Sequence, residues 1–205
     1  MNKIILSLAA VLILFTACRK ETPNTSVSGT VEESVSHTGI AYAKVRLLAL
    51  ETNCYSCVPS EVASYDADAS GAYSFEFSQQ EGYVYEIRAK KEKYFDSTTG
   101  VSITAGEKNT AVRIMLDAEA YLKLYVKNTS PFDGNDKIII TGDWSGGLYD
   151  NVYDGTGIDT VVYKTVRAGS QVKVNWAVTK NSITAPYSAA LNCSALDTTF
   201  YNINY

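Results

Sequence analysis

The sequence predicts an all-β protein built from two β-sandwich domains in tandem. Short segments alternate apolar and polar residues, turn-forming residues separate these segments, and no helical spacing of apolar residues lies between them. Tyr, Thr, Ser, Val and Gly are abundant, a composition that favours strands. A chain of 205 residues suits one large or two small domains, and its 46% apolar residues suffice for a core.

The charge pattern argues against a nucleic-acid-binding protein. The net charge is -4, and the Lys and Arg residues are scattered along the chain. A nucleic-acid surface needs clustered basic charge, so no nucleic-acid partner is expected. No segment after the N-terminal region is long and apolar enough to cross a bilayer.

The N-terminal region predicts export. A basic start, Asn2-Lys3, precedes an apolar run from Ile4 to Phe15 that is too short to span a membrane. Residues 14–18, Leu-Phe-Thr-Ala-Cys, resemble the lipobox of bacterial lipoproteins. The resemblance implies that a signal peptide, residues 1–17, is cut before Cys18 and that the Cys18 thiol is lipidated. A plain secretory signal with Cys18 as a bystander, or an uncut anchor helix, are the alternatives.

Residues 18–24 are predicted to be the lipidated cysteine and a short polar tether, in which Pro23 discourages regular structure. Two or three acyl chains would bury many methylenes at ~0.8 kcal/mol each, so lipid alone would hold the protein on a membrane. The protein is therefore expected in the cell envelope, anchored by lipid to the outer membrane. The sequence leaves open whether it faces the periplasm or the cell surface.

Residues 25–117 are expected to form the first sandwich. Each predicted strand alternates inward apolar residues with outward polar ones. A turn at residues 66–71, rich in Asp and Ser and ending in Gly71, joins two of these strands. The predicted strands lie around residues 27–31, 43–50, 62–65, 73–77, 83–89 and 112–116.

Several motifs of this region resemble the carboxypeptidase regulatory-like domain. They are Gly29-Thr30-Val31, the run from Ala43 to Leu47, the hairpin from Asp68 to Phe75, the run from Tyr85 to Ala89, and Tyr94-Phe95. The resemblance implies a transthyretin-like, immunoglobulin-type sandwich with an accessory role and no active-site residues. The sequence departs from the family where residues 40–42 replace the usual Pro and Gly, and residues 52–59 look inserted.

Residues 118–205 are expected to form the second sandwich, with six strands. The predicted strands lie around residues 122–126, 138–141, 161–166, 172–178, 187–191 and 200–203. Trp176 alternates with valines and is predicted to lie in the core. The aromatic hairpin of the first domain is not reproduced, so the sequence shows no clean repeat.

Four cysteines occur, and Cys18 carries lipid if the lipobox prediction holds. Cys54 and Cys57 could pair in an exported protein, or one of them could pair with Cys193. Free thiols and a redox role are alternatives, although no helix is predicted to lower a thiol pKa. Zinc would need further ligands, and His37 is the only histidine.

The long segment from Thr141 to Asp159 is the predicted ligand-binding loop. It carries the aromatic residues Trp144, Tyr149 and Tyr153 and the carboxylates Asp143, Asp150 and Asp154. Aromatic rings beside carboxylates suit the faces and hydroxyls of sugars. The alternative is a Gly-rich hairpin loop whose aromatic residues cover the end of the sandwich.

No catalytic residues, metal or cofactor are expected. The start of the turn at Asp66 resembles a calcium loop, but position twelve is Phe77 where a Glu is needed. The predicted function is a non-catalytic cell-envelope lipoprotein that binds a protein complex or a glycan. A structural pilus or surface-layer subunit, and a hydrolase that uses loop carboxylates, are the alternatives.

Overall fold

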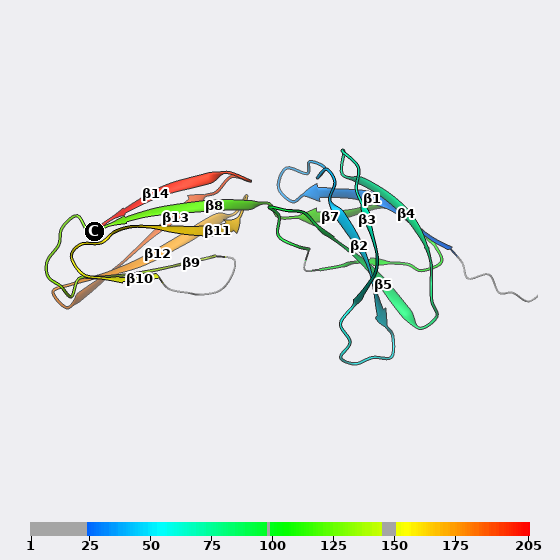
Figure 1. Ribbon diagram of the computed structural model, residues 1–205, viewed down its shortest axis with the longest axis horizontal. Coiled ribbons are helices and arrows are strands. Elements are labelled where there is room, and N and C mark those ends of the chain that lie inside the picture. The colour runs from blue at the N-terminus through cyan, green and yellow to red at the C-terminus, as the bar shows by residue number, and fades with distance from the viewer. Residues whose placement is uncertain (1–23, 98, 145–150) are drawn as a thin grey trace, which may run out of the picture.

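The structure, a computed structural model, describes residues 24–97, 99–144 and 151–205. Within these ranges every regular element is a strand, as the sequence predicts. The strands form two sandwiches that lie end to end, with β1 at one end of the long axis and the C-terminus at the other (Figure 1). Among these residues, the structure has no helix of the length and apolarity that a membrane span requires. The signal peptide and Cys18 lie outside the described residues.

The first sandwich contains strands β1–β7. A three-stranded sheet of order β4-β1-β7 packs on a four-stranded sheet of order β3-β2-β5-β6. Strand β1 pairs antiparallel with β4 and parallel with β7. The strands are β1 Asn24–Glu33, β2 Lys44–Glu51, β3 Ser60–Asp66, β4 Ala72–Ser78, β5 Tyr83–Lys90, β6 Val101–Ile103 and β7 Lys108–Leu116.

Aromatic rings fill much of the first core. Tyr73 and Phe75 of β4 and Tyr85 of β5 are buried, and the ring of Phe75 stacks on Tyr65 of β3 with centroids 4.0 Å apart. Phe77 packs on Tyr85 at 4.8 Å. These rings lie at alternate positions because successive side chains of a strand point to opposite faces. Aliphatic residues from β1, β2 and β7 complete this core.

The turn before β4 is held by one carboxylate. Asp68 accepts hydrogen bonds from the backbone N–H groups of Ser70 at 2.7 Å and Ala72 at 3.0 Å. Gly71 has φ of +83°, and a Cβ there would lie 2.7 Å from the Val31 oxygen, so only glycine fits. Hydrogen bonds from the Ser70 side chain and from these backbone groups lower the pKa of Asp68.

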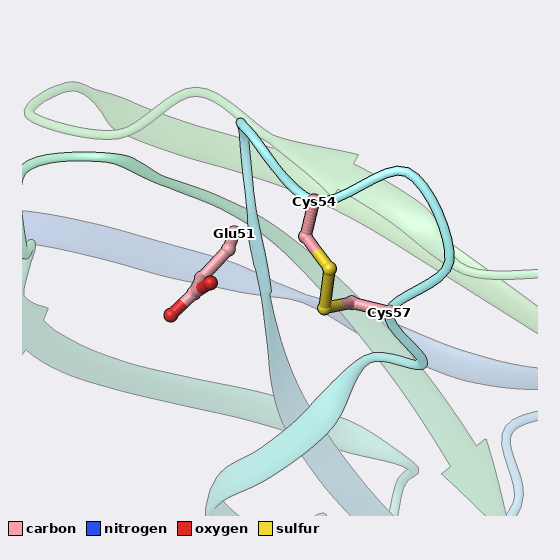
Figure 2. A group of neighbouring side chains, drawn as sticks. All are labelled: Glu51, Cys54 and Cys57. Carbon is pink, nitrogen blue, oxygen red and sulfur yellow. A yellow bond between two sulfur atoms is a disulfide. The ribbon is translucent and has the colours of Figure 1, made fainter.

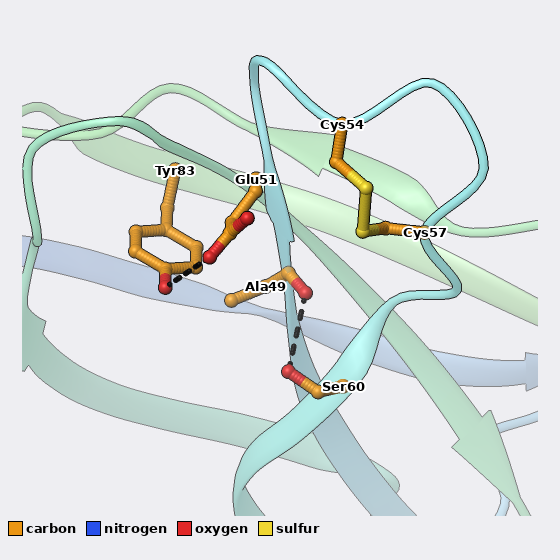
Figure 3. Close-up of a disulfide and its surroundings, with 6 residues drawn as sticks. All are labelled: Ala49, Glu51, Cys54, Cys57, Ser60 and Tyr83. Atoms are coloured by element: carbon orange, nitrogen blue, oxygen red, sulfur yellow. Dashed lines mark hydrogen bonds between the residues drawn. A yellow bond between two sulfur atoms is a disulfide. The ribbon is translucent and has the colours of Figure 1, made fainter.

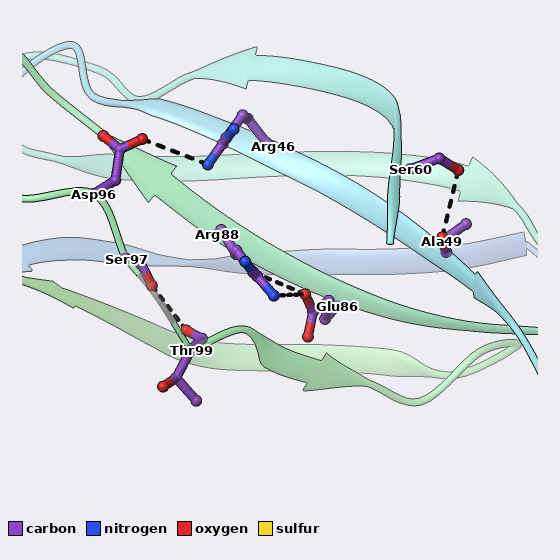
Figure 4. Close-up of polar contacts among 8 residues, drawn as sticks. All are labelled: Arg46, Ala49, Ser60, Glu86, Arg88, Asp96, Ser97 and Thr99. Atoms are coloured by element: carbon purple, nitrogen blue, oxygen red, sulfur yellow. Dashed lines mark hydrogen bonds and ion pairs between the residues drawn. The ribbon is translucent and has the colours of Figure 1, made fainter. Parts of the chain in front are cut away.

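Polar side chains cover the outer face of the four-stranded sheet. Arg88 pairs with Glu86 at 2.6 Å, and Arg46 pairs with Asp96 at 3.8 Å (Figure 4). Such surface pairs are worth about 0–1 kcal/mol, so they make this face soluble more than they stabilise it.

The second sandwich contains strands β8–β14 and repeats the topology of the first. Its sheets have the orders β11-β8-β14 and β10-β9-β12-β13, and β8 pairs parallel with β14 as β1 does with β7. The two halves thus share a strand topology, although the aromatic hairpin of the first is not reproduced in the sequence of the second. The strands are β8 Glu119–Lys127, β9 Lys137–Gly142, β10 Asn151–Asp154, β11 Asp159–Arg167, β12 Gln171–Lys180, β13 Ile183–Asn192 and β14 Thr198–Asn204.

The six predicted strands of this half are all present, and β10 is one more. It lies within the predicted binding loop and pairs antiparallel with β9, where Val152 stands opposite Ile139. The second core is mainly aliphatic, and its largest fully buried side chains are Leu122, Leu124, Ile138, Ile140 and Ile203. Trp176 is only partly buried against this core.

The junction between the sandwiches is short and hydrogen-bonded on both sides. Only Asp117 and Ala118 separate β7 from β8. Asp117 accepts from the Phe95 N–H at 2.9 Å, and Ala118 accepts from the Ala168 N–H at 3.0 Å. Tyr94 packs against both cores. The two linking residues are therefore hydrogen-bonded, one to each sandwich, and do not form an unpaired linker.

Arg167 adds a further contact across the junction. Its guanidinium forms an ion pair with Asp117 and lies over the Phe95 ring, 4.5 Å from the centroid. The planar guanidinium suits this stacked and paired position better than an ammonium would.

Candidate functional site

The outer face of the sheet β11-β8-β14 carries exposed aromatic side chains. Tyr125 is 38% exposed, Tyr163 66% and Phe200 61%. They come from all three strands of the sheet and surround Lys123 of β8. We call Lys123, Tyr125, Tyr163 and Phe200 the aromatic face.

Strand register brings these four residues together. Lys123 stands opposite Tyr163 on β11 and opposite Phe200 on β14, so the three form one row across the sheet. Tyr125 lies two residues along β8 and therefore on the same face. Its ring and that of Phe200 are nearly parallel, with centroids 6.4 Å apart and an angle of 21°.

The alternation of β8 explains why the rings are outside. Leu122, Leu124 and Val126 point into the core and are fully buried, so the residues between them must point outward. The aliphatic residues fill the interior, and the aromatic residues are not needed there. Their position on the surface therefore has no explanation in core packing.

Lys123 lies among the rings. Its Nζ is 4.9 Å from the Tyr125 centroid, 5.2 Å from that of Tyr163 and 5.9 Å from that of Phe200. These are cation–π distances. Hydrogen bonding to the Tyr125 hydroxyl, and then to that of Tyr163, raises the pKa of Lys123 above its usual value. The ammonium is thus charged at neutral pH.

No carboxylate of the described chain forms an ion pair with Lys123. Lys127, the next outward lysine of β8, is paired with Asp159 at 2.7 Å. In the opposite direction along β8, the Tyr121 hydroxyl donates a hydrogen bond to Glu119 Oε2, with 2.9 Å between the two oxygens. The aromatic face therefore has one uncompensated positive charge at its centre.

The structure places the described residues of the predicted binding loop in two kinds of surroundings. Trp144 and Tyr153 are half-buried and pack against the second core, while Asp143 and Asp154 are exposed. Asp154 pairs with Lys137 at 3.8 Å. Tyr149 and Asp150 lie outside the described residues. The described aromatic residues of this loop therefore contact the core, as its alternative interpretation expects.

Trp144 has a cation–π partner of its own. Lys164 Nζ lies 5.6 Å from its ring centroid and donates to Asn151 Oδ1 at 3.5 Å. Trp144 Nε1 and Asn151 Nδ2 are buried without a hydrogen-bond partner among the described residues. The predicted loop residues therefore remain a prediction, and the structure does not gather them into one described site.

The structure joins Cys54 and Cys57 by a disulfide in the loop between β2 and β3 (Figure 3). Cys193 is a free, buried thiol in the second sandwich. The loop places Tyr55 in full contact with solvent. At its base, Tyr83 donates to Glu51 at 3.0 Å. The disulfide therefore constrains an exposed hairpin tip.

Glu51 lies beside this disulfide, with a carboxylate oxygen within 4.8 Å of the sulfur atoms (Figure 2). This carboxylate and the two sulfurs could hold zinc only if both sulfurs were thiolates. While the disulfide is intact, neither sulfur is available, so the cluster is not a metal site in this state.

Three described carboxylates have lowered pKa values, and each holds a turn. Asp68 holds the turn before β4. Glu33 holds the turn after β1, where it accepts a hydrogen bond from the Ser36 N–H at 2.7 Å. Asp136 is fully buried and accepts from the Asn128 amide at 2.8 Å and the Phe132 N–H at 2.9 Å. Desolvation opposes the lowering of the Asp136 pKa, but these hydrogen bonds and the charge of Lys180 prevail. The hydrogen bonds that lower these three pKa values hold turns and loops, so we interpret the three carboxylates as structural groups.

No family model matches the chain, and no curated protein matches it. The resemblance of residues 25–117 to the carboxypeptidase regulatory-like domain therefore stays a prediction.

Several solved structures show a weak likeness. A streptococcal ancillary pilin is 12% identical with a TM-score of 0.39, and the match covers 90% of this chain and 63% of the pilin. The Bacillus anthracis TIE protein is 10% identical with a TM-score of 0.38, covering 88% of this chain and 34% of that protein. The shaft pilin SpaA of Lactobacillus rhamnosus GG is 9% identical with a TM-score of 0.35, covering 89% and 97%.

The chain thus spans less than two thirds of the first two proteins. TM-scores this low do not establish a shared overall fold. The candidate site therefore rests on the residues of this chain alone.

Sequence reasoning did not single out the aromatic face. The strand predicted around residues 122–126 alternates Tyr121, Lys123 and Tyr125 with apolar residues, and this pattern gives the outward side of β8. Tyr163 and Phe200 lie far away in sequence, and only the pairing of β11 and β14 with β8 places them beside Lys123. A search for aromatic residues at outward positions of several strands would have found them.

Proposed function

We propose that this protein is a non-catalytic, lipid-anchored module of the cell envelope that binds its partner through the aromatic face. The observation that carries the proposal is the exposure of Tyr125, Tyr163 and Phe200 around Lys123 on one sheet. Exposed aromatic clusters on soluble proteins mark binding sites more often than single exposed rings do. Tyrosine also has an apolar ring and a polar hydroxyl, which suits a surface that contacts water in the free protein and a partner in the complex.

The arrangement of the two sandwiches supports this role. β1 begins at one end of the long axis, and the second sandwich lies at the other (Figure 1). If Cys18 is lipidated, the tether joins the membrane to the first sandwich. The hydrogen-bonded junction at Asp117 and Ala118 then holds the aromatic face at a distance from the lipid. The first sandwich is a spacer in this proposal, and the second is the binding unit.

A binding assay with matched variants tests the proposal. The full chain is purified from membranes in detergent and used to capture partners from a glycan panel and from envelope extracts. We expect the double variant Tyr163→Ala/Phe200→Ala to lose captured partners. Tyr55→Ala is the control, because Tyr55 is at least as exposed but lies on the first sandwich. Equal capture by all three proteins would disprove the aromatic face as the binding surface.

The anchor has its own test. Cys18→Ala should release the protein from the membrane fraction and abolish incorporation of a labelled fatty acid. If the variant were still labelled and membrane-bound, the lipobox prediction would be wrong. The aromatic face could still bind its partner, so the two parts of the proposal fail separately.

A further inference from the structure

We propose that the ligand of the aromatic face is a carboxylate-bearing polysaccharide, one that contains uronic acid residues. This inference rests on the proposed function and specifies the class of ligand. It follows from three properties of the face: its area, the charge at its centre and its polar surroundings.

The area is small for a protein partner. An aromatic side chain buries roughly 150–250 Å² when it is fully covered. At exposures of 38%, 66% and 61%, Tyr125, Tyr163 and Phe200 offer about 300 Å² together. A stable protein–protein interface buries about 800 Å² on each partner. The three rings alone offer the area of a few sugar units, and a folded protein would need contacts well beyond them.

Its geometry suits sugar rings. The rings of Tyr125 and Phe200 are nearly parallel and lie on the same face of the sheet. The C–H face of a pyranose can pack on such rings and lose its water there. Asn202 stands opposite Tyr125 on β14 and is exposed, so its amide can exchange hydrogen bonds with sugar hydroxyls.

The charge selects an acidic sugar. Lys123 has no carboxylate partner among the described residues, and its ammonium lies at the centre of the rings. An ammonium that has no carboxylate partner and lies among exposed rings attracts a carboxylate to this face. A charge-assisted hydrogen bond from Lys123 to a uronate would supply the missing partner.

A neighbouring lysine shows why Lys123 is the relevant charge. Lys127 lies on the same side of β8 but is already paired with Asp159 at 2.7 Å. A ligand carboxylate would have to displace Asp159 to reach it. Substituting Lys127 should therefore change binding less than substituting Lys123.

The test compares three probes on the full chain: polygalacturonate, the same backbone with its carboxylates methyl-esterified, and dextran as a neutral glucan. We expect polygalacturonate to bind at least tenfold more tightly than the esterified polymer, and this preference to weaken with salt. Lys123→Met keeps most of the apolar stem and removes the charge, so the preference should disappear. Lys127→Met is the matched control and should keep the preference.

The outcomes separate the two proposals. Equal affinity for the acidic and esterified polymers, unchanged by Lys123→Met, would overturn the inference and leave the proposed function intact. Binding of an envelope protein instead, lost in Tyr163→Ala/Phe200→Ala, would also overturn it while the face remains a binding surface. If the double variant retained every interaction of the native protein, the proposed function and this inference would both fail.

Discussion

The two sandwiches have the same strand topology but place their aromatic residues on opposite sides. In the first, Tyr73, Phe75 and Tyr85 are buried in the core. In the second, Tyr163 and Phe200 are more than half exposed, and the core is mainly aliphatic. A common topology therefore leaves open which side of a sheet the large rings occupy. The alternation of each strand decides it.

The outer faces of the equivalent sheets differ accordingly. In β4-β1-β7, the outward residues of β1 include Ser26, Ser28 and Thr30, and Glu32 pairs with Arg113 at 3.7 Å. In β11-β8-β14, the corresponding side carries the aromatic face. Small polar residues suffice to make an outer face soluble, so the first sandwich provides an internal reference for the second. Substitutions of inner and outer rings should accordingly affect different properties.

The largest effect on stability is expected from an inner ring. Phe75→Ala removes a buried ring that stacks on Tyr65 at 4.0 Å, and such changes cost about 3–5 kcal/mol. Both tryptophans, Trp144 and Trp176, lie in the second sandwich, so their fluorescence reports its unfolding separately. Denaturant titration should show a lower midpoint by far-UV circular dichroism and an almost unchanged tryptophan midpoint.

If both signals shifted together, the sandwiches would unfold as one unit. The junction contacts of Ala118 and Arg167 would then couple the two cores more strongly than their separate interiors suggest.

A smaller effect is expected from the disulfide. Cys54 and Cys57 are 3 residues apart, and closing so short a loop contributes at most ~2 kcal/mol in the chain-entropy model. Cys54→Ser/Cys57→Ser should therefore lower the midpoint of the first sandwich less than Phe75→Ala does. The same variant should bind polygalacturonate normally, because the aromatic face lies on the second sandwich. A loss of binding in this variant would place part of the ligand site on the first sandwich.

The sequence was sufficient for the strand positions and the faces of most strands, because alternation is a local property. It missed β6, Val101–Ile103, and β10, Asn151–Asp154, because both are short and each pairs with a single described strand, β5 and β9. It also missed the repeated topology, because the same strand order is filled by different residue types. The aromatic face depends on the register of strands that are far apart in sequence, which no local pattern contains.

Acid should affect the second sandwich through Asp136. Folding lowers the pKa of the Asp136 carboxyl below the value near 3.8 that it has in the unfolded chain. The ionised carboxylate therefore stabilises the folded state at pH values above 3.8. This stabilisation is lost as the pH falls through the pKa of the folded state. Asp136→Asn should lower stability at pH 7 and flatten the pH dependence below about pH 4. Tryptophan fluorescence during acid titration measures this directly. An unchanged acid transition in the variant would mean that Asp136 does not hold the loop beside Asn128 and Phe132.

The smallest effect on stability is expected from the outer ring Phe200. Its side chain is 61% exposed and leaves the core intact, so Phe200→Ala should change stability by no more than about 0.5 kcal/mol. The same change removes one of the three rings around Lys123, so binding of polygalacturonate should fall at least severalfold. Denaturant midpoint and affinity, measured on the same preparation, separate the two effects. A loss of stability as large as that of Phe75→Ala would show that Phe200 is a structural ring after all, and the contrast between the two sandwiches would lose its functional meaning.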